Sequence, residues 1–379
     1  MNPPLGGLDT ATFLREYWQK KPLLIRRAMP GFEPELDIDD IAGLACEELA
    51  ESRLVTGSFP AHDWTVQYGP FDERALSGLP DSDWTLLVQD VEKHYPPLKP
   101  LLTAFAFLPR WRLDDLMVSV AAKGGSVGPH TDQYDVFLLQ AKGRRKWQIA
   151  ENFAPQLLEG CELNVLRSFE PEQEWTLEPG DMLYLPPGIA HHGIALETCM
   201  TWSAGMRAPS CADLLQALGE WLAETHAEGS RYGDPDLQDG RPGAEIDAAS
   251  IQRMRELAVG AVQDESVFAD FLGMFLSRYR MAHEPAPPTQ TIEIAGLTDA
   301  LNRGFRLRHN PWTRLFWINS ADGAALFAAG TRYSCSAETA SLVCEDELLK
   351  DRSGDLAATD PELMCRLVND GHLYLEDAK

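Results

Sequence analysis

The feature that most constrains the fold of this chain is a series of short, strand-like runs between residues 116 and 206. Glycine and proline residues lie in the segments that separate them. The runs are Leu116 to Ala121, Val136 to Gln140, Lys146 to Ile149, Trp175 to Leu177, Met182 to Leu185, His191 to Leu196 and Thr201 to Met206. Short strands with such turns at close spacing predict an all-β barrel or sandwich.

Two side chains with metal-binding chemistry lie two residues apart in the stretch from Gly124 to Trp147. In an extended strand, His130 and Asp132 point to the same side. An imidazole and a carboxylate in this relation supply two ligands of a 2-His-1-carboxylate site, the arrangement typical of non-haem Fe(II) oxygenases. Because H-x-D is common by chance, the prediction depends on a third ligand from a distant strand.

The expected source of that ligand is the segment from Leu177 to Leu196. Its sequence E-P-G-D predicts a turn in which Gly180 takes a positive φ. Two prolines end the strand that follows, and the chain becomes extended again at His191 or His192. Local rules leave both histidines open, because neighbouring residues of a strand point to opposite faces.

The order of these motifs resembles a known family. H-T-D, then G-R-R-K-W, then G-D-M-L-Y-L-P-P-G-x-x-H resembles the JmjC/cupin branch of the 2-oxoglutarate oxygenases. More narrowly, the chain is similar to the bacterial ribosomal oxygenases that hydroxylate an arginine of a large-subunit ribosomal protein. The segments Phe13 to Ala28, Trp111 to Asp135 and Gly205 to Ser210 carry the same likeness, so it covers most of the chain.

The resemblance implies a mainly β catalytic core, a double-stranded β-helix (jelly-roll), with a helical dimerisation region and a C-terminal winged-helix-like domain. It selects His191 as third ligand, because the family's ligand follows P-P-G-x-x directly. His130, Asp132 and His191 are then the expected catalytic Fe(II) ligands, with 2-oxoglutarate and dioxygen as co-substrates. The implied reaction hydroxylates the β-carbon of an arginine in the sixteenth protein of the large ribosomal subunit.

The far carboxylate of 2-oxoglutarate needs a cation deep in the barrel. In the strand R-R-K-W-Q-I-A, Arg145 shares one face with Trp147 and Ile149, whereas the residues of the other face are wholly polar and fit solvent. Arg145 is therefore the expected cation, since its planar fork binds a carboxylate through two hydrogen bonds. The family pattern agrees, because its cation stands two residues before the tryptophan. Ser119 is a candidate second donor, with a satisfied core hydroxyl as the alternative.

Three further side chains are candidates for holding a guanidinium substrate. Tyr134 has the strand parity of the two ligands in H-T-D, which predicts that it flanks the metal. Asp115 is the candidate partner of the substrate cation at the mouth of the barrel. Ser203 is the candidate for a further hydrogen bond from a neighbouring strand. Plain packing is the alternative for Tyr134.

Composition limits the partners. The net charge of −25 argues against nucleic-acid binding and favours a cationic partner, although acidity also serves solubility alone. Seven scattered cysteines without C-x-x-C pairs indicate reduced thiols, as in a cytoplasm. No apolar run of membrane-spanning length occurs, and the N-terminus lacks the features of a secretory signal.

The 379 residues divide into four predicted parts. Residues 1–100 are an α/β lead-in that braces the barrel, and residues 101–209 are the barrel itself. Residues 210–284 carry amphipathic helices, which by resemblance mediate homodimerisation, the alternative being that they pack on the barrel. A Pro-rich linker, Glu284 to Gln290, precedes the winged-helix-like part at 291–379. Acidic residues 345–347 argue against DNA binding there.

Other functions compete with arginine hydroxylation. A histidyl residue or a small molecule would suit the same chemistry, and so would an N-methyl group in a demethylase. From another class, a cupin can keep the fold as a binding module without catalysis. The complete ligand set and Arg145 count against that last alternative, since a binding module would tolerate their loss.

Overall fold

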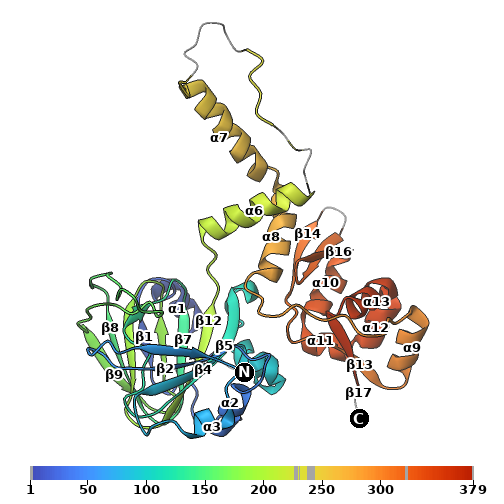
Figure 1. The fold of residues 1–379 in the computed structure, drawn as a ribbon. Coiled ribbons are helices and arrows are strands. Elements are labelled where there is room, and N and C mark those ends of the chain that lie inside the picture. Colours follow the sequence, from blue (N-terminus) through green and yellow to red (C-terminus); the bar gives the residue numbers. More distant parts are fainter. Residues whose placement is uncertain (1–2, 226–228, 230, 237–243, 321–322, 378–379) are drawn as a thin grey trace. The chain divides into compact units, whose positions relative to one another are not determined.

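The computed structural model describes residues 3–225, 229, 231–236, 244–320 and 323–377. The chain divides into two compact units, Met1–Ala208 and Pro209–Lys379 (Figure 1). Among the described helices, none combines the length and the apolar character that crossing a bilayer requires.

The first unit contains two antiparallel sheets that face each other (Figure 1). The larger sheet has the order β1–β10–β7–β12–β5–β4–β2–β3, and the smaller has the order β6–β11–β8–β9. Their strands are β1 Leu23–Ile25, β2 Ser52–Thr56, β3 Thr65–Tyr68, β4 Trp84–Val88, β5 Leu113–Ala121, β6 His130–Thr131, β7 Val136–Lys142, β8 Arg145–Ala150, β9 Gln173–Leu177, β10 Met182–Leu185, β11 Ala190–Ala195 and β12 Cys199–Met206. From β5 to β12 the chain passes back and forth between the sheets, which is the winding of a double-stranded β-helix.

Alternation along β5 gives the larger sheet two different faces. Leu116, Val118 and Val120 belong to the main hydrophobic core of this unit. On the other side, Ser119 accepts a hydrogen bond from Arg145 of the smaller sheet. The polar site therefore lies between the sheets, and the apolar core lies behind the larger one.

Short helices contribute to that apolar core. They are α1 Thr10–Glu16, α2 Ile38–Leu44, α3 Glu73–Ser77, α4 Val91–His94 and α5 Lys99–Thr103, with 3₁₀ turns at Pro96–Leu98 and Arg110–Arg112. Asp9 caps the first helix by accepting a hydrogen bond from the Thr12 amide, and Asp37 begins the second with a capping box. Buried Phe13 and Ile41 then belong to the same core as β5.

The segment before β5 also extends the larger sheet. β1 pairs with β10 at one edge, and β4, β2 and β3 continue the sheet beyond β5. Both edges of the barrel's larger sheet are therefore covered by strands from the first hundred residues. This covering leaves fewer unpaired backbone groups at the strands that carry the site.

The second unit begins with three longer helices and continues into a mixed α/β part. The elements are α6 Cys211–Thr225, α7 Ala248–Gln263, α8 Glu265–Arg278, α9 Ile294–Asn302, β13 Phe305–His309, β14 Leu315–Ser320, β15 Gly323–Ala328, β16 Thr331–Cys335, α10 Ala337–Cys344, α11 Asp346–Asp351, α12 Ser353–Thr359, α13 Pro361–Asn369 and β17 Leu373–Asp377. β14–β15–β16 form one sheet and β13–β17 another. α8 packs closely on β15, since a Cβ at Gly273 would lie 2.3 Å from the Phe327 ring.

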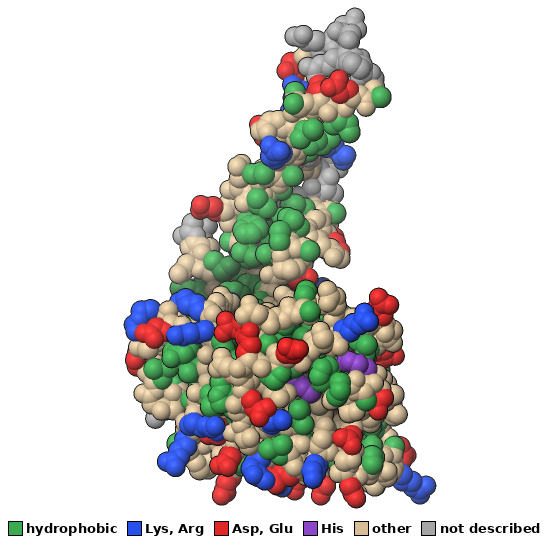
Figure 2. Space-filling model, turned by 90° about the vertical axis from the view of Figure 1, so that its left-hand side faces the viewer, with side chains coloured by type: hydrophobic (Ala, Val, Ile, Leu, Met, Phe, Trp, Pro, Cys, Tyr) green, Lys and Arg blue, Asp and Glu red, His purple; other side chains and the backbone are tan. Residues whose placement is uncertain are grey.

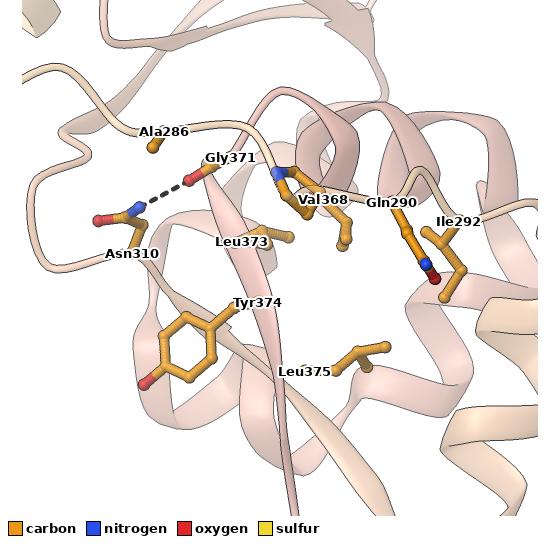
Figure 3. Close-up of a pocket in the computed structure, with 10 residues that line it drawn as sticks. Ala286, Gln290, Ile292, Asn310, Val368, Gly371, Leu373, Tyr374 and Leu375 are labelled. Atoms are coloured by element: carbon orange, nitrogen blue, oxygen red, sulfur yellow. Dashed lines mark hydrogen bonds between the residues drawn. The ribbon is translucent and has the colours of Figure 1, made fainter.

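A pocket of about 370 Å³ lies in the second unit, between the Pro-rich segment and β17 (Figure 3). Its wall includes Pro288, Leu373 and Leu375, and the Asn310 amide beside it donates a hydrogen bond to the Gly371 carbonyl. The lining residues include none of the predicted site residues and no histidine, cysteine or carboxylate. This pocket therefore lacks the groups that metal binding or acid–base chemistry would need.

Candidate metal centre

The three predicted metal ligands come together in the first unit. One ligand atom each of His130, Asp132 and His191 lies within 4.8 Å of the others. Nε2 of His191 is 3.6 Å from Oδ2 of Asp132, and the two imidazole centroids are 4.2 Å apart. Two imidazoles and one carboxylate at these separations match the donor set of a 2-His-1-carboxylate centre.

Strand pairing explains how His130 and His191, 61 positions apart, meet. β6 and β11 are antiparallel neighbours, and His130 stands directly opposite His191 in their register. β6 ends at Thr131, so Asp132 lies just beyond the strand. Its backbone carbonyl accepts a hydrogen bond from the Gly188 amide at 2.8 Å, which ties the Asp132 loop to the turn before β11.

Backbone carbonyls orient both imidazoles. Nδ1 of His130 lies 2.9 Å from the Gly128 carbonyl oxygen, and Nδ1 of His191 lies 3.0 Å from that of Ile189. An Nδ1–H that donates to a carbonyl leaves Nε2 as the lone-pair nitrogen, which is the second shell expected for metal-bound histidine. Burial, reinforced by neighbouring His130, lowers the pKa of His191 to about 4, so this imidazole is neutral near pH 7. The chemistry of the donor set therefore fits a divalent iron.

The neighbouring histidine lies on the other face of β11. The His192 ring packs against Phe59 and Phe169, with centroids 5.8 and 6.1 Å away. Burial lowers its pKa to about 3, with His130 and Arg145 adding to the effect. Local sequence rules left the two histidines open, and the structure brings only His191 into the cluster.

Arg145 is a buried cation without a carboxylate partner. Its exposed fraction is 3%, and among the described residues no carboxylate forms an ion pair with it. Nη1 donates to Ser119 Oγ at 3.1 Å and to Thr201 Oγ1 at 3.2 Å, whereas Nε has no partner in the described part of the chain. Burial lowers the pKa of Arg145. An isolated buried charge is costly, so this arrangement fits a site in which a ligand supplies the carboxylate.

Ser119, the predicted second donor to the co-substrate carboxylate, lies beside the Arg145 guanidinium. It is an acceptor for Arg145, and its own hydroxyl lies 3.4 Å from the Thr201 carbonyl. Thr201 in turn donates to Oε1 of Gln140 at 3.1 Å. Gln140 was not predicted as a site residue, although its position as a polar residue within the apolar run V-F-L-L-Q-A is a signal that could have singled it out.

Strand register separates Arg145 from the metal ligands by a defined interval. On adjacent strands β8 and β11, Arg145 is opposite Ala195 and Ile149 is opposite His191. Four residues of extended backbone span about 13 Å between Cα atoms. After the two side chains reach toward each other, that interval is suited to a short dicarboxylate lying along the strands.

A glycine makes room for the aromatic ring between these two ends. Gly193 is opposite Trp147 in the register, and a Cβ on it would lie 2.8 Å from the Trp147 ring. The ring centroid is 5.5 Å from the Arg145 guanidinium and 6.0 Å from the His191 ring. Trp147 therefore forms an apolar wall between the cation and the metal ligands.

The three predicted substrate residues lie at different positions. Ser203 is buried and pairs with Met117 on β5, in the same alternating set as Thr201. Asp115 lies near the start of β5, and a Cβ at Gly205 would be 3.2 Å from its Oδ1. Burial, with Asp114 next in importance, raises the pKa of Asp115 well above its usual value.

Tyr134 does not lie on the strand whose alternation was used to predict its position. Because β6 stops at Thr131 and residues 133 and 134 form a bend, the alternation of a strand does not extend to Tyr134. Its ring nevertheless packs against the cluster between the sheets that contains Val136, Leu138 and Trp147. Tyr134 thus borders the space between the sheets by way of the bend.

Comparisons with known proteins agree with the site and the fold. The family model for the JmjC domain matches residues 100–214, and that for the ROXA-like winged helix matches residues 260–374. The class of the protein is therefore a JmjC-type cupin with a helical region and a C-terminal winged helix, as the sequence predicted.

Full-length relatives narrow this class. The chain is 34% identical to the ribosomal protein uL16 3-hydroxylase of Escherichia coli, over 97% of this chain and 98% of that protein. A crystal structure of E. coli YcfD aligns over 98% of this chain and 99% of the other, with a TM-score of 0.87 and 33% identity. The structure of YcfD with cobalt and 2-oxoglutarate has a TM-score of 0.83 and 31% identity, over 98% and 99% of the two chains. This chain belongs to the bacterial JmjC ribosomal oxygenases.

Proposed function

We propose that this chain is an Fe(II)- and 2-oxoglutarate-dependent oxygenase that hydroxylates the β-carbon of an arginine in ribosomal protein uL16. The observation that carries the proposal is the unpaired, buried Arg145 four strand positions from the His130–Asp132–His191 cluster. The relative named for uL16 3-hydroxylation supports the substrate, and the relative crystallised with cobalt and 2-oxoglutarate supports the co-substrate.

His130, Asp132 and His191 would hold the iron through two Nε2 atoms and one carboxylate oxygen. Arg145 would bind the far carboxylate of 2-oxoglutarate through the side of its fork that includes Nε. Bound iron and 2-oxoglutarate supply the oxidising chemistry, in which dioxygen is reduced as 2-oxoglutarate becomes succinate and CO2 and one oxygen atom enters the C–H bond. The protein's own task is to orient the co-substrate and to hold one carbon of the arginine near the metal.

The proposed arginine pocket consists of Asp115, Tyr134 and Ser203. Asp115 supplies a carboxylate for the guanidinium, Tyr134 an aromatic wall and Ser203 a hydroxyl. Gly205, beside the Asp115 carboxylate, adds no side chain that would fill the space above it. A positively charged substrate also suits the chain's net charge of −25.

Mass spectrometry of uL16 tests the proposal directly. The iron-loaded full chain is incubated with uL16, 2-oxoglutarate and isotopically labelled dioxygen, and fragments of uL16 are compared with a sample lacking 2-oxoglutarate. We expect one labelled oxygen on the β-carbon of an arginine. Labelling of a histidine, loss of a methyl group, or an unchanged uL16 beside full 2-oxoglutarate consumption would each contradict it.

We also infer that α6 to α8 form a homodimer interface. α7 packs on α8 but has no buried residue. Its apolar side chains nevertheless form one face, which consists of Ile251, Met254, Ala258 and Val262. Exposed fractions of 48% for Ile251 and 54% for Met254 are high for large apolar side chains. Figure 2 shows hydrophobic side chains gathered along this helical part. An unpartnered apolar helix face of this kind fits the same helices of a second copy.

We propose a separate role for each of the four predicted parts of the chain. Residues 1–100 brace the barrel, 101–209 carry the chemistry, 210–284 join two copies, and 291–379 support the dimer without contacting nucleic acid. Since the proposed substrate is a ribosomal protein, we assign the reaction to the cytoplasm.

A further inference from the structure

A buried carboxylate stands beside the strand residue that follows Asp115. Glu92, the second residue of α4, is 4% exposed, and its Oε2 accepts a hydrogen bond of 2.9 Å from the Leu116 amide of β5. The last register pair between β4 and β5 is Val88 with Val118. Beyond that pair, the Glu92 side chain takes the hydrogen bond that a neighbouring strand would otherwise accept. Glu92 therefore fixes the backbone from which Asp115 projects.

The start of α4 makes a second contact with Asp115. The amide of Asp90 lies 3.4 Å from Oδ2 of Asp115, and Asp90 is held in the left-handed region with φ 54°. The Asp90 carboxylate forms an ion pair with Lys93. The Asp115 carboxylate thus contacts the same short helix that carries Glu92.

Negative charge exceeds positive charge around this contact. Among the described residues, the charged groups around this contact include Asp90 at the N-cap of α4, Glu92 and Lys93 on α4, Asp114 and Asp115 on β5, and Arg207 after β12. Arg207 Nε is 2.9 Å from Asp114 Oδ1. These four carboxylates and two cations carry a net charge of −2 when all are ionised, and two of the carboxylates, Asp90 and Glu92, are buried. Two neighbouring buried carboxylates oppose each other's ionisation.

The electrostatics agree with this count. Burial raises the pKa of Glu92 to about 7, with Lys93 opposing and Asp90 adding to the rise. Glu92 is itself one of the charges that raise the pKa of Asp115. Ionisation of Glu92 therefore makes ionisation of Asp115 less favourable, so the protonation states of the two carboxyl groups are linked.

We propose that Glu92 is a positioning residue for the substrate cation, one that shares a proton with Asp115 and makes substrate binding release it. This rests on the proposed function, in which Asp115 binds a guanidinium. A cation at Asp115 favours the ionised state of both carboxyl groups, so binding becomes tighter as the pH rises toward 7 and levels off above it. Release of one proton corresponds to a slope of up to about tenfold per pH unit.

The test measures KM for uL16, kcat and substrate-independent 2-oxoglutarate turnover of the iron-loaded full chain between pH 6 and pH 8. Glu92→Gln keeps an oxygen acceptor for the Leu116 amide and removes the titration. We expect its KM to lose the pH slope of the wild type, while kcat keeps the wild-type profile. Glu73→Gln, an exposed carboxylate on α3, is the matched control and should keep the wild-type slope.

A second variant guards against misfolding of the first. Lys93→Met removes the cation that lowers the pKa of Glu92, so the KM profile should shift to higher pH. A wild-type slope in folded Glu92→Gln, or an unshifted profile in Lys93→Met, would overturn the proposal. A fall of substrate-independent 2-oxoglutarate turnover in parallel with uL16 hydroxylation would also overturn it, because Glu92 would then support the barrel as a whole and not the substrate cation.

Calorimetry separates this proposal from the proposed function. Binding of uL16 at pH 7, measured in two buffers of different ionisation enthalpy, counts the protons released without any turnover. The wild type should release more than Glu92→Gln, and equal release would contradict the role of Glu92. Absence of hydroxylation together with this difference would count against the reaction alone. Asp115→Asn should raise KM for uL16 at every pH. An unchanged KM would show that the Asp115 carboxylate does not bind the substrate guanidinium.

Discussion

Arg145 and Ser119 join the two sheets of the first unit through a hydrogen bond of 3.1 Å, from Nη1 of the arginine on β8 to Oγ of the serine on β5. Thr201 on β12 takes a second bond from the same nitrogen at 3.2 Å. These hydroxyls fix one side of the guanidinium, and Nε on the other side is left without a described partner. The larger sheet thereby orients a cation that the smaller sheet carries.

Replacing Arg145 should therefore act on 2-oxoglutarate above all. Arg145→Gln removes a charge-assisted pair of hydrogen bonds worth about 2–3 kcal/mol, so KM for 2-oxoglutarate should rise on the order of 100-fold. Steady-state kinetics with varied 2-oxoglutarate measures this effect. Arg144→Gln is the control, since exposed Arg144 pairs with Glu197 and should leave KM unchanged. Equal effects of the two variants would show that Arg145 is not the anchor.

The adjacent histidines of β11 should separate metal binding from packing. His191→Ala removes a proposed ligand, so purified protein should lose most of its bound iron while its fold persists. His192→Ala leaves a cavity beside Phe59 and Phe169, which should lower stability by about 2–4 kcal/mol without releasing iron. Metal analysis and denaturant unfolding measure the two quantities. Iron retained by His191→Ala, or by the double variant with His130→Ala, would rule out the proposed centre.

The alternation of side chains along a strand predicted that Arg145 points inward, but it could not choose between His191 and His192 as the third metal ligand. In β8, the face opposite Arg145 carries only polar residues, which indicated that Arg145 points inward. The structure shows that Arg145 is buried. In β11, His191 and His192 are both buried, so polarity gives no such contrast. Only the family pattern of P-P-G-x-x-H distinguished them before the strand register was known.

Contacts between distant segments explain what the sequence missed. Glu92 lies in a short helix whose sequence V-E-K-H suggests a solvated surface, and its partner Leu116 is 24 residues away. Tyr134 was assigned by a strand period that ends three residues earlier, at Thr131. Neither the hydrogen bond of Glu92 nor the bend before Tyr134 leaves a local signal, because both depend on how β5 and β6 are arranged in space.

Adding one methyl group to Gly193 should distort the co-substrate site. A Cβ there would lie 2.8 Å from the ring of Trp147, which stands between Arg145 and His191. Gly193→Ala should cost about 1–3 kcal/mol of stability through overpacking and should raise KM for 2-oxoglutarate. Denaturant unfolding and steady-state kinetics measure both.

A glycine in open surroundings provides the matched control. Gly219 lies within α6, and outside its own stretch of helix no atom lies within 4 Å of an added Cβ, so Gly219→Ala should stabilise the helix by up to about 1 kcal/mol and leave KM unchanged. If Gly193→Ala behaved like Gly219→Ala, the close approach of Trp147 to β11 would have no part in holding the co-substrate.

The proposed dimer depends on the apolar face of α7, and a charge placed there should break it. Met254 is 54% exposed, and a second copy would bury it together with Ile251 and Val262. Met254→Glu would place an ion in that interface, where an unpaired charge costs several kcal/mol. Light scattering should therefore report a dimer for the wild type and a monomer for Met254→Glu. Glu256→Lys, a charge change on an exposed side chain of the opposite face of α7, should leave the dimer intact. A wild-type monomer, or equal dissociation by both variants, would mean that this face serves another contact.

Because the proposed metal ligands all lie within residues 130–191, the monomeric variant should still bind iron and turn over 2-oxoglutarate.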